Sequence, residues 1–414
     1  MKVLLSALAC EPNIGSEPEV GFRAMMAAAT RHDVWVLTNE ANAGPLQRAL
    51  ASHRDRAVAE RVRVEGIDFG VDADRLDRLS ASEHHWFYDR WQRRAAVVAL
   101  RLNDRVDFDV VHHITLASYW TRVGVAAVPK PLVLGPLGGA LNVPWSLVPE
   151  LGLRGLAQEA ARAVARFALA RVPSIRDAQR RAAVTFAQNR ASARRISATG
   201  DVSVLSNALC VSLGEMPSGS RSKDLLFVGR LLPWKAPIIA LRALRHVTNW
   251  ETVLRFCGDG PERARLQRAA RRWGLEQRVR FEGWLNRDDL LTLMAGAGAV
   301  VHPCLREEAG LCVAETLSVG TPLVFLDRGG PAEFAAQWDG SPHIKVPLGP
   351  PGRTARAMAT AIDEALADAP PVPAEARPPR TSFVEAILEA YAIAGASGDP
   401  GRRAPLPSDH PEQG

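Results

Sequence analysis

Two carboxylates, Glu307 and Glu315, stand eight positions apart in the stretch REEAGLCVAETLSVGTPLV, shortly after the apolar segment AVVHPC. Gly310 between them permits an unusual backbone angle, and LCVAETLSVG predicts a helix that stops at Gly320. We expect Glu307 on the loop before this helix and Glu315 within its first turns, both near one mouth of a sheet. Carboxylates are bidentate acceptors for vicinal diols, so the pair suits a ligand that carries sugar and ribose hydroxyls.

The start of the same predicted helix is suited to binding an anionic or polar ligand. Its free backbone N–H groups, from Gly310 through Leu311 to Val313, are expected to face a phosphate or a polar sugar, as helix N-termini commonly do. The remaining carboxylate of this loop, Glu308, is interpreted as a solvated neighbour. The stretch therefore predicts a binding site for a polar, anionic ligand.

The segment VGRLLPWKA places two cations beyond a predicted strand. Gly229 follows the strand, and Arg230 and Lys235 lie on the loop after it. Arginine supplies a planar fork and lysine a mobile point charge, a combination that suits a diphosphate. Taken alone, the loop is explained at least as well by two solvated surface cations.

The segment FCGDGPERARLQ predicts a tight turn between a strand and a helix. Gly258 and Gly260 allow the turn, Pro261 stands near the start of the helix, and Glu262 falls in its first turn. The segment lacks both the GK[ST] of a Walker loop and the GxGxxG fingerprint. A turn without ligand contact is as good an interpretation as a binding loop.

The elements that must position these residues form an α/β pattern. Short apolar segments alternate with helical patterns in both halves of the chain, which predicts parallel strands joined by crossover helices. The segments are VLLSALA, DVWVLT, VRVEGID, DVVHHI, PLVLGPLGG and AVTFAQN in the first half and LLFVGRLL, VLRFCGDG, VRFEGW, AVVHPC and PLVFLD in the second. The polar, turn-rich residues 214–224 interrupt the pattern. We expect Rossmann-like domains over residues 1–213 and 225–380, a linker between them, and a ligand site in the cleft where they meet.

The ends of the chain and its composition add further expectations. Residues 381–395 predict a final helix that packs across the domain junction, and residues 396–414 predict a disordered tail. The five scattered cysteines form no CxxC pair, which argues against zinc and disulfides. A net charge of +6 invites an anionic partner, yet no common nucleic-acid motif is present, so nucleic acid is not expected. Without a long apolar run or a leader, we expect a cytoplasmic protein.

The order GRL…K, GDGPER, E-x7-E, GTPLV and GGPAE over residues 225–335 resembles the retaining GT-B glycosyltransferases of family 4. Near the start of the chain, SALACEPNIGSEPEVGFRAM resembles that family's first strand, glycine loop and helix. The resemblance implies two doubly wound Rossmann-like domains that face a cleft. It also implies a hexosyltransferase that moves a sugar from a nucleotide diphosphate sugar to an acceptor hydroxyl with retention, without a metal or other cofactor.

Carried over by position, the resemblance implies roles for individual residues. Arg230 and Lys235 would bind the donor diphosphate, Glu315 the ribose and Glu307 the transferred sugar. Gly15 would let a loop approach the donor. The other donor-binding residues it implies are Gly229, Gly258, Gly310 and Leu311.

The resemblance also implies a histidine at the reacting centre, and the chain departs from the family pattern at two positions. His113 or His112 would lie at the reacting centre, and a buried, hydrogen-bonded strand residue is the alternative interpretation. The usual EGFG is EEAG here, and Ala236 stands where a glycine usually follows the lysine. The first departure is expected to alter sugar preference, and neither removes a charged group.

The acceptor is expected to be a glycolipid or polysaccharide intermediate. The aromatic and basic residues 83–94 suit a membrane interface or sugar stacking, and residues 154–181 form a basic helical pattern with an apolar face. The latter predicts either an ordinary helix packed on the sheet or peripheral contact with an anionic membrane at its inner face. A nucleotide-sugar 2-epimerase and a non-catalytic sugar-nucleotide-binding protein are the alternative functions.

Overall fold

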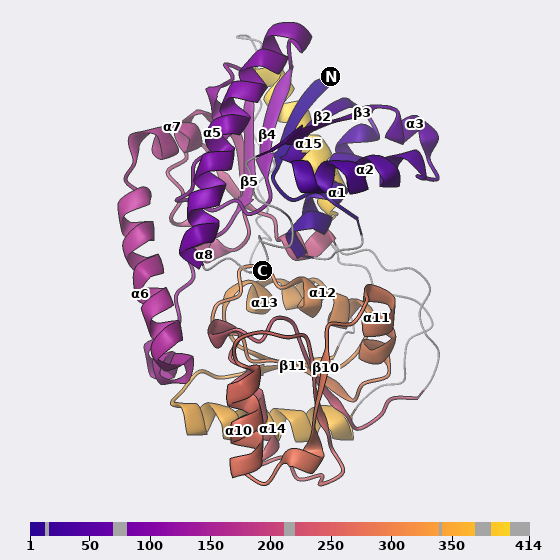
Figure 1. The fold of residues 1–414 in the computed structure, drawn as a ribbon, viewed down its shortest axis with the longest axis vertical. Helices are drawn as coiled ribbons and strands as arrows, with labels where there is room; N and C mark the ends of the chain where they lie inside the picture. The colour runs from indigo at the N-terminus through magenta and orange to yellow at the C-terminus, as the bar shows by residue number, and fades with distance from the viewer. Residues whose placement is uncertain (13–15, 69–80, 211–219, 339–341, 369–381, 398–414) are drawn as a thin grey trace, which may run out of the picture.

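The computed structural model describes residues 1–12, 16–68, 81–210, 220–338, 342–368 and 382–397. Two parallel sheets, one in each half of the chain, organise these residues (Figure 1). The first sheet has the strand order β3-β2-β1-β4-β5-β6-β7 and the second β10-β9-β8-β11-β12-β13. The prediction of an α/β protein with two Rossmann-like sheets is confirmed.

Strands of the first sheet follow the apolar segments read from the sequence. Their central members are buried along their whole length, as parallel strands covered on both faces must be. The strands are β1 (Lys2–Ala7), β2 (Asp33–Asn39), β3 (Val62–Ile67), β4 (Val110–Ile114), β5 (Leu132–Leu137), β6 (Ala182–Ala187) and β7 (Val202–Val204).

Helices cover both faces of this sheet, because alternate residues of each strand point to opposite sides. Val3 and Leu5 of β1 face a core shared with α1 and with the last helix, α15 (Phe383–Ser397), whereas Leu4 faces a core shared with α5. The helices of this half are α1 (Ser16–Ala29), α2 (Glu40–Ala51), α3 (Arg56–Ala59), α5 (Ala81–Val106), α6 (Gly152–Leu169), α7 (Pro173–Arg181) and α8 (Arg190–Ala193), with 3-10 turns η1 (Gly124–Ala127), η2 (Trp145–Leu151) and η3 (Asn207–Cys210).

The second sheet repeats this arrangement. Leu225 and Phe227 of β8 face a core shared with α9 and α14, and Leu226 and Val228 face the side of α12. The strands are β8 (Leu225–Val228), β9 (Leu254–Cys257), β10 (Val279–Gly283), β11 (Ala299–His302), β12 (Leu323–Leu326) and β13 (His343–Val346). The helices are α9 (Pro237–Leu244), α10 (Arg263–Arg272), α11 (Arg287–Ala295), α12 (Leu311–Ser318), α13 (Gly329–Phe334), α14 (Pro351–Ala367) and α15 (Phe383–Ser397), with 3-10 turns η4 (Pro233–Lys235), η5 (Glu276–Arg278) and η6 (Ala335–Gln337).

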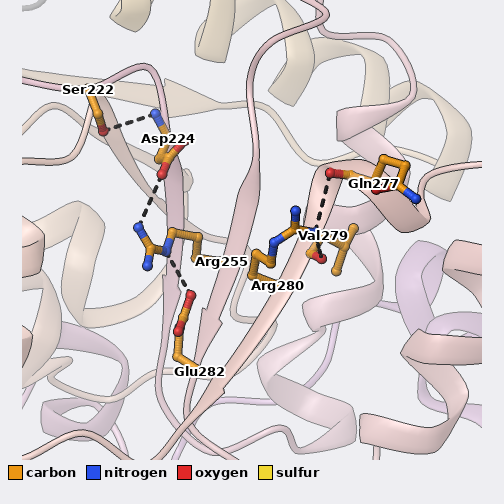
Figure 2. Close-up of polar contacts among 7 residues, drawn as sticks. All are labelled: Ser222, Asp224, Arg255, Gln277, Val279, Arg280 and Glu282. Atoms are coloured by element: carbon orange, nitrogen blue, oxygen red, sulfur yellow. Dashed lines mark hydrogen bonds and ion pairs between the residues drawn. The ribbon is translucent and has the colours of Figure 1, made fainter.

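An ion-pair ladder crosses three strands of the second sheet (Figure 2). Arg255 on β9 donates to Asp224, just before β8, at 3.3 Å and to Glu282 on β10 at 2.8 Å. On the adjacent strand, the Arg280 guanidinium donates to the carbonyls of Gln277 and Val279. The ladder lies partly in solvent, so its contribution to stability is small, about 1 kcal/mol at most for each pair.

The last helix returns to the first half of the chain. In Figure 1, α15 lies beside α1 in the upper half, and it contacts α1, β5 and β6. The Tyr391 hydroxyl of α15 lies 2.8 Å from Nδ1 of His112 on β4. The chain therefore crosses from the second sheet back to the first. Residues 211–219 of the region around the predicted linker and residues 398–414 of the predicted tail lie outside the described residues.

Two strands were not predicted, namely β7 (VSV) and β13 (HIKV). Both lie at an edge of a sheet, and both are short and partly exposed. Edge strands lack the long apolar run that marks a strand buried on both faces. Their sequences therefore carry little signal.

Candidate functional site

The predicted donor residues meet where the strand order of the second sheet reverses. β8 pairs in parallel with β11, so the loops that follow these two strands leave the same edge side by side. One loop carries Gly229 to Lys235, and the other carries Glu307 and leads into α12. Such a switch point at the carboxyl ends of strands is where ligands bind in open α/β sheets.

The two loops are joined by an ion pair. Nζ of Lys235 donates to Oε2 of Glu307 at 2.8 Å and lies over Gly229, 4.0 Å from where a Cβ would stand. Burial alone would lower the pKa of Lys235, but the Glu307 carboxylate outweighs burial and raises that pKa above its ordinary value. Burial would likewise raise the pKa of Glu307, but the ammonium holds it below its ordinary value. Both groups are therefore charged near neutral pH.

The GDGPER loop (residues 258–263) packs against the loop that carries Lys235 (residues 229–235), which we call the cationic loop. A Cβ on Gly258 would stand 2.3 Å from the Gly229 carbonyl oxygen, and one on Gly260 would stand 2.6 Å from the Leu231 carbonyl oxygen. Leu231 N–H donates to the Asp259 carbonyl at 2.9 Å. Only glycine permits this close backbone approach at φ values of 139° and 156°. The loop acts as a brace in this structure.

The helix after this loop begins slightly later than its sequence indicates. α10 starts at Arg263, so Glu262 precedes it as the N-cap residue and does not lie in the first turn. The Glu262 N–H instead donates to the Leu231 carbonyl at 3.0 Å. This hydrogen bond links the end of the GDGPER loop to the cationic loop.

The predicted helix is present as α12, and it opens at the predicted glycine. Gly310 has φ 80° and makes no side-chain cap, so the first N–H groups of the helix, including that of Leu311, have no capping side chain. A Cβ on Gly310 would stand 3.1 Å from Cγ of Glu307. The helix start, Glu307 and Lys235 therefore form one polar cluster.

Glu315 has a different partner from Glu307. It is buried within α12, and Nη1 of Arg287 on α11 donates to its Oε1 at 2.6 Å. Burial raises the pKa of Glu315, and Arg287 partly offsets that increase. Arg287 was not among the predicted site residues, because nothing in its segment NRDDLL distinguishes it from a surface arginine.

Arg230, next to Gly229, is exposed to solvent.

An acidic residue of the first half interacts electrostatically with this cluster. Glu17 on α1 accepts a 2.6 Å hydrogen bond from the N–H of Leu116, beyond the end of β4. Burial raises the pKa of Glu17, the Leu116 N–H lowers it, and the charge of Glu307 raises it further. Glu17 therefore interacts electrostatically with the donor loops across the two halves of the chain. Sequence reasoning missed Glu17, although it stands in the segment that resembles the family's first helix.

Both candidate histidines lie inside the first sheet. Nδ1 of His112 contacts the Tyr391 hydroxyl and its Nε2 contacts the Gly135 carbonyl at 2.9 Å. Nε2 of His113 lies 2.9 Å from the Tyr88 hydroxyl, and both rings are buried. Burial lowers the pKa of His112 to about 4 and that of His113 to about 3. These contacts are those of buried, hydrogen-bonded strand residues, and the predicted reaction-centre role stays a prediction.

Glu308 is not the solvated neighbour expected from the sequence. Its carboxylate accepts from Leu141 N–H at 3.0 Å, Asn189 Nδ2 at 2.7 Å and Ser192 Oγ at 3.1 Å. Leu141 lies in the loop after β5, Asn189 is the N-cap of α8 after β6, and Ser192 lies within α8, so Glu308 connects the two halves of the molecule. A single sequence does not show which carboxylate of EEAG has partners 119 positions away. Gly15, the predicted glycine of the first loop, lies outside the described residues.

The cluster also contains groups that could ligate a metal. Among the described residues, His302, Cys304 and Glu307 bring potential ligand atoms within 4.8 Å of one another. Burial lowers the pKa of His302 to about 4 and raises that of Cys304 to about 12, so the thiol is protonated. Lys235 already neutralises Glu307. We therefore interpret the group as support for the lysine and keep the absence of a metal as a prediction.

Comparisons with known proteins point to one kind of enzyme for the second half of the chain. Residues 215–378 match the family model described as glycosyl transferases group 1. The chain is 29% identical over 175 residues to a 2-deoxystreptamine glucosyltransferase from Streptomyces kanamyceticus, an alignment that covers 42% of each protein. The matched segment thus spans less than half of that relative's length.

Solved structures match nearly the whole chain. Sucrose-phosphate synthase from Thermosynechococcus elongatus has a TM-score of 0.57 and 18% identity, over 96% of this chain and 97% of that one. HepE of Anabaena, solved in complex with UDP, has a TM-score of 0.52 and 17% identity, over 97% and 99%. Together with the two parallel sheets, these matches show that the chain has the GT-B fold.

Proposed function

We propose that this protein is a glycosyltransferase that moves a sugar from a nucleoside diphosphate sugar to an acceptor hydroxyl. The observation that carries the proposal is the cluster of Lys235, Glu307 and the start of α12 at the switch point of the second sheet. The cluster lies within the residues that match glycosyl transferases group 1. Its charges and N–H groups suit a diphosphate attached to a sugar.

In the proposed reaction, the cationic loop and the helix start act on the leaving group. Lys235, Arg230 and the N–H groups at Gly310 and Leu311 stabilise the negative charge that grows on the departing diphosphate. When Lys235 turns to the diphosphate, the carboxylate of Glu307 becomes free to accept hydroxyls of the transferred sugar. Gly229 leaves room for the diphosphate, and Gly258 supports that loop.

Three further residues have roles in this proposal. Glu315, held by Arg287 at 2.6 Å, accepts the ribose hydroxyls. His113, or its neighbour His112, would act near the reaction centre, although both rings are buried in the structure. Gly15 would let the first loop approach the donor.

We infer retention at the anomeric carbon, of hexosyltransferase type. Glu307 is paired with an ammonium at 2.8 Å, which suits an acceptor of hydroxyls better than a covalent nucleophile. A front-face reaction, in which the leaving phosphate takes the acceptor proton, needs no protein nucleophile and no metal. HepE was solved with UDP and with UDP-glucose, so a uridine donor is the first to test.

The proposed acceptor is a saccharide on a lipid carrier or in a growing polysaccharide, bound by the first half of the chain. Glu17 is a first-half carboxylate that interacts electrostatically with Glu307, and it would contact the acceptor. A peripheral contact with an anionic membrane on the cytoplasmic side would give access to a lipid-linked acceptor. None of the helices among the described residues is both long and apolar enough to cross a membrane.

The test is incubation of the protein with UDP-glucose and GDP-mannose, with release of nucleoside diphosphate measured over time. The released or transferred sugar is then examined by NMR. We expect slow hydrolysis that yields the donor's own α-anomer, and its loss in Lys235→Ala. Lys223→Ala, which removes an exposed lysine paired with Glu251, is the matched control.

Two results would overturn the proposal. A sugar epimerised at C2 would identify a 2-epimerase. Donor binding without any turnover, even with a panel of saccharide acceptors, would identify a non-catalytic binding protein.

A further inference from the structure

Helix α6 exposes apolar side chains in a single stripe. The exposed fractions are 88% for Leu153, 47% for Leu156, 70% for Val164 and 63% for Phe167. These residues recur every three or four positions or multiples of that spacing, so they share one face of the helix. Trp145 on the preceding turn η2 is 92% exposed. Contiguous apolar side chains in water usually mark an interaction surface.

The opposite face of α6 is polar and holds the helix to the protein. Arg162 donates to the carbonyls of Gly139 and Leu141, and Arg166 donates to that of Ala140. Glu159 pairs with Arg306 at 2.8 Å. This polarity is the reverse of an ordinary surface helix, whose apolar face turns inward. For α6, the expectation that residues 154–181 pack their apolar face on the sheet is wrong, whereas α7 buries Ile175 and Ala178.

The helix lies at the outer edge of the molecule and bridges its two halves (Figure 1). A Cβ on Gly155 would stand 2.7 Å from Pro233, on the loop that carries Lys235. Arg306, the partner of Glu159, immediately precedes Glu307. The stripe is therefore fixed relative to both donor loops, and whatever binds it lies beside the proposed site.

Arginines stand at both ends of the stripe. Arg154 is exposed next to Leu153, and the Arg171 guanidinium lies 3.6 Å from the ring centroid of Phe167. An apolar stripe flanked by exposed cations matches the boundary between acyl chains and anionic headgroups of a lipid bilayer. The net charge of +6 adds a general attraction to such a surface.

We propose that the outward face of α6, with Trp145, is a docking surface for an anionic lipid bilayer. The apolar side chains enter the acyl region, and Arg154 and Arg171 contact the headgroups. A second copy of this chain fits less well, because two such faces packed together would bring four exposed arginines into one interface. The helix lies flat on the bilayer, and the polar contacts of Arg162 and Arg166 remain on the protein side.

The test is flotation of the purified full chain with vesicles of phosphatidylcholine alone or mixed with phosphatidylglycerol. We expect the wild type to float with the anionic vesicles and much less with the neutral ones. The triple variant L153Q/V164Q/F167Q is expected to lose the binding, since each buried apolar side chain contributes about tenfold to partitioning. R154Q/R171Q should lose the preference for anionic vesicles.

A matched control replaces exposed apolar residues elsewhere, namely W284Q/L348Q/V384Q, and should float like the wild type. Equal flotation of wild type and L153Q/V164Q/F167Q, or no flotation of the wild type, would overturn the proposal. So would sedimentation that shows a dimer lost only in the triple variant, without any vesicle binding, because that result identifies a second copy. The assay needs no donor or acceptor, so its failure leaves the proposed transfer reaction untouched.

Discussion

Lys235 and Glu307 hold each other in place where the proposed donor must bind. Their 2.8 Å contact keeps both ionised, and it also means that each residue must change partner when a diphosphate sugar enters. The sequence predicted both residues, because their loops follow recognisable apolar strands. It did not predict the contact between them, since they stand 72 positions apart.

Replacement of Glu307 by Gln should separate binding from transfer. Glutamine retains the size but loses the charge that accepts sugar hydroxyls most strongly, so we expect turnover to fall roughly 100-fold. Nucleotide binding should change little, because Lys235 remains available to the diphosphate. Steady-state release of nucleoside diphosphate measures the first effect and a nucleotide titration the second. Glu251→Gln, at an exposed carboxylate, is the control, and wild-type turnover in Glu307→Gln would exclude an essential role for Glu307.

At the level of elements, the strands that carry the site were predictable and several of their connections were not. β8 and β11 are short apolar runs buried along their length, and they have clear signals. The role of GDGPER as a brace depends on the approach of two loops, and no local pattern reveals that approach. Glu308 shows the same limit, because its three partners come from the other half of the chain.

The close approach of Gly258 to the Gly229 carbonyl predicts that alanine costs more unfolding free energy at Gly258 than at Gly274. Gly258→Ala would put a Cβ 2.3 Å from the Gly229 carbonyl at φ 139°, so we expect a loss of more than about 2 kcal/mol in unfolding free energy. Gly274 also has positive φ, 67°, but its Cβ would meet nothing within 4 Å, and Gly274→Ala should cost about 1 kcal/mol. Urea denaturation of both variants measures the difference. Equal costs would show that the contact with Gly229 contributes nothing.

For the whole molecule, α15 links the end of the chain to the core of the first sheet. Its Tyr391 contacts His112, which stays neutral because burial lowers its pKa to about 4. The composition and alternation of segments predicted two sheets and a final helix. They did not predict this buried polar contact, because it joins residues 279 positions apart.

The burial of His112 and His113 predicts that the free energy of unfolding depends on pH. An unfolded histidine binds a proton below about pH 6.5, whereas folded His112 and His113 do so only near pH 4 and 3. The unfolded state therefore binds more protons between about pH 6.5 and 4, and these histidines destabilise the fold as pH falls through that range. Each contributes on the order of 1 kcal/mol per pH unit. Glu17 and Glu315, whose pKa values are raised, oppose the effect.

The contribution of one histidine can be isolated by comparing slopes. Unfolding free energy measured by urea denaturation from pH 7 to pH 5 should fall less steeply in His112→Gln than in the wild type. His53→Gln, at a partly exposed histidine of the loop after α2, should retain the wild-type slope. An unchanged slope in His112→Gln would mean that His112 is not held neutral in the fold.

The central claim is that the Lys235 loop and the start of α12 form a nucleoside diphosphate site. Calorimetric titration of the wild type with UDP, GDP and ADP, repeated on Lys235→Ala and on the control Lys223→Ala, tests it most directly. We predict that one nucleotide binds the wild type and Lys223→Ala alike, and binds Lys235→Ala roughly 100-fold more weakly, about 3 kcal/mol. Binding that is equal in all three proteins, or no binding of any nucleotide to the wild type, would contradict the account.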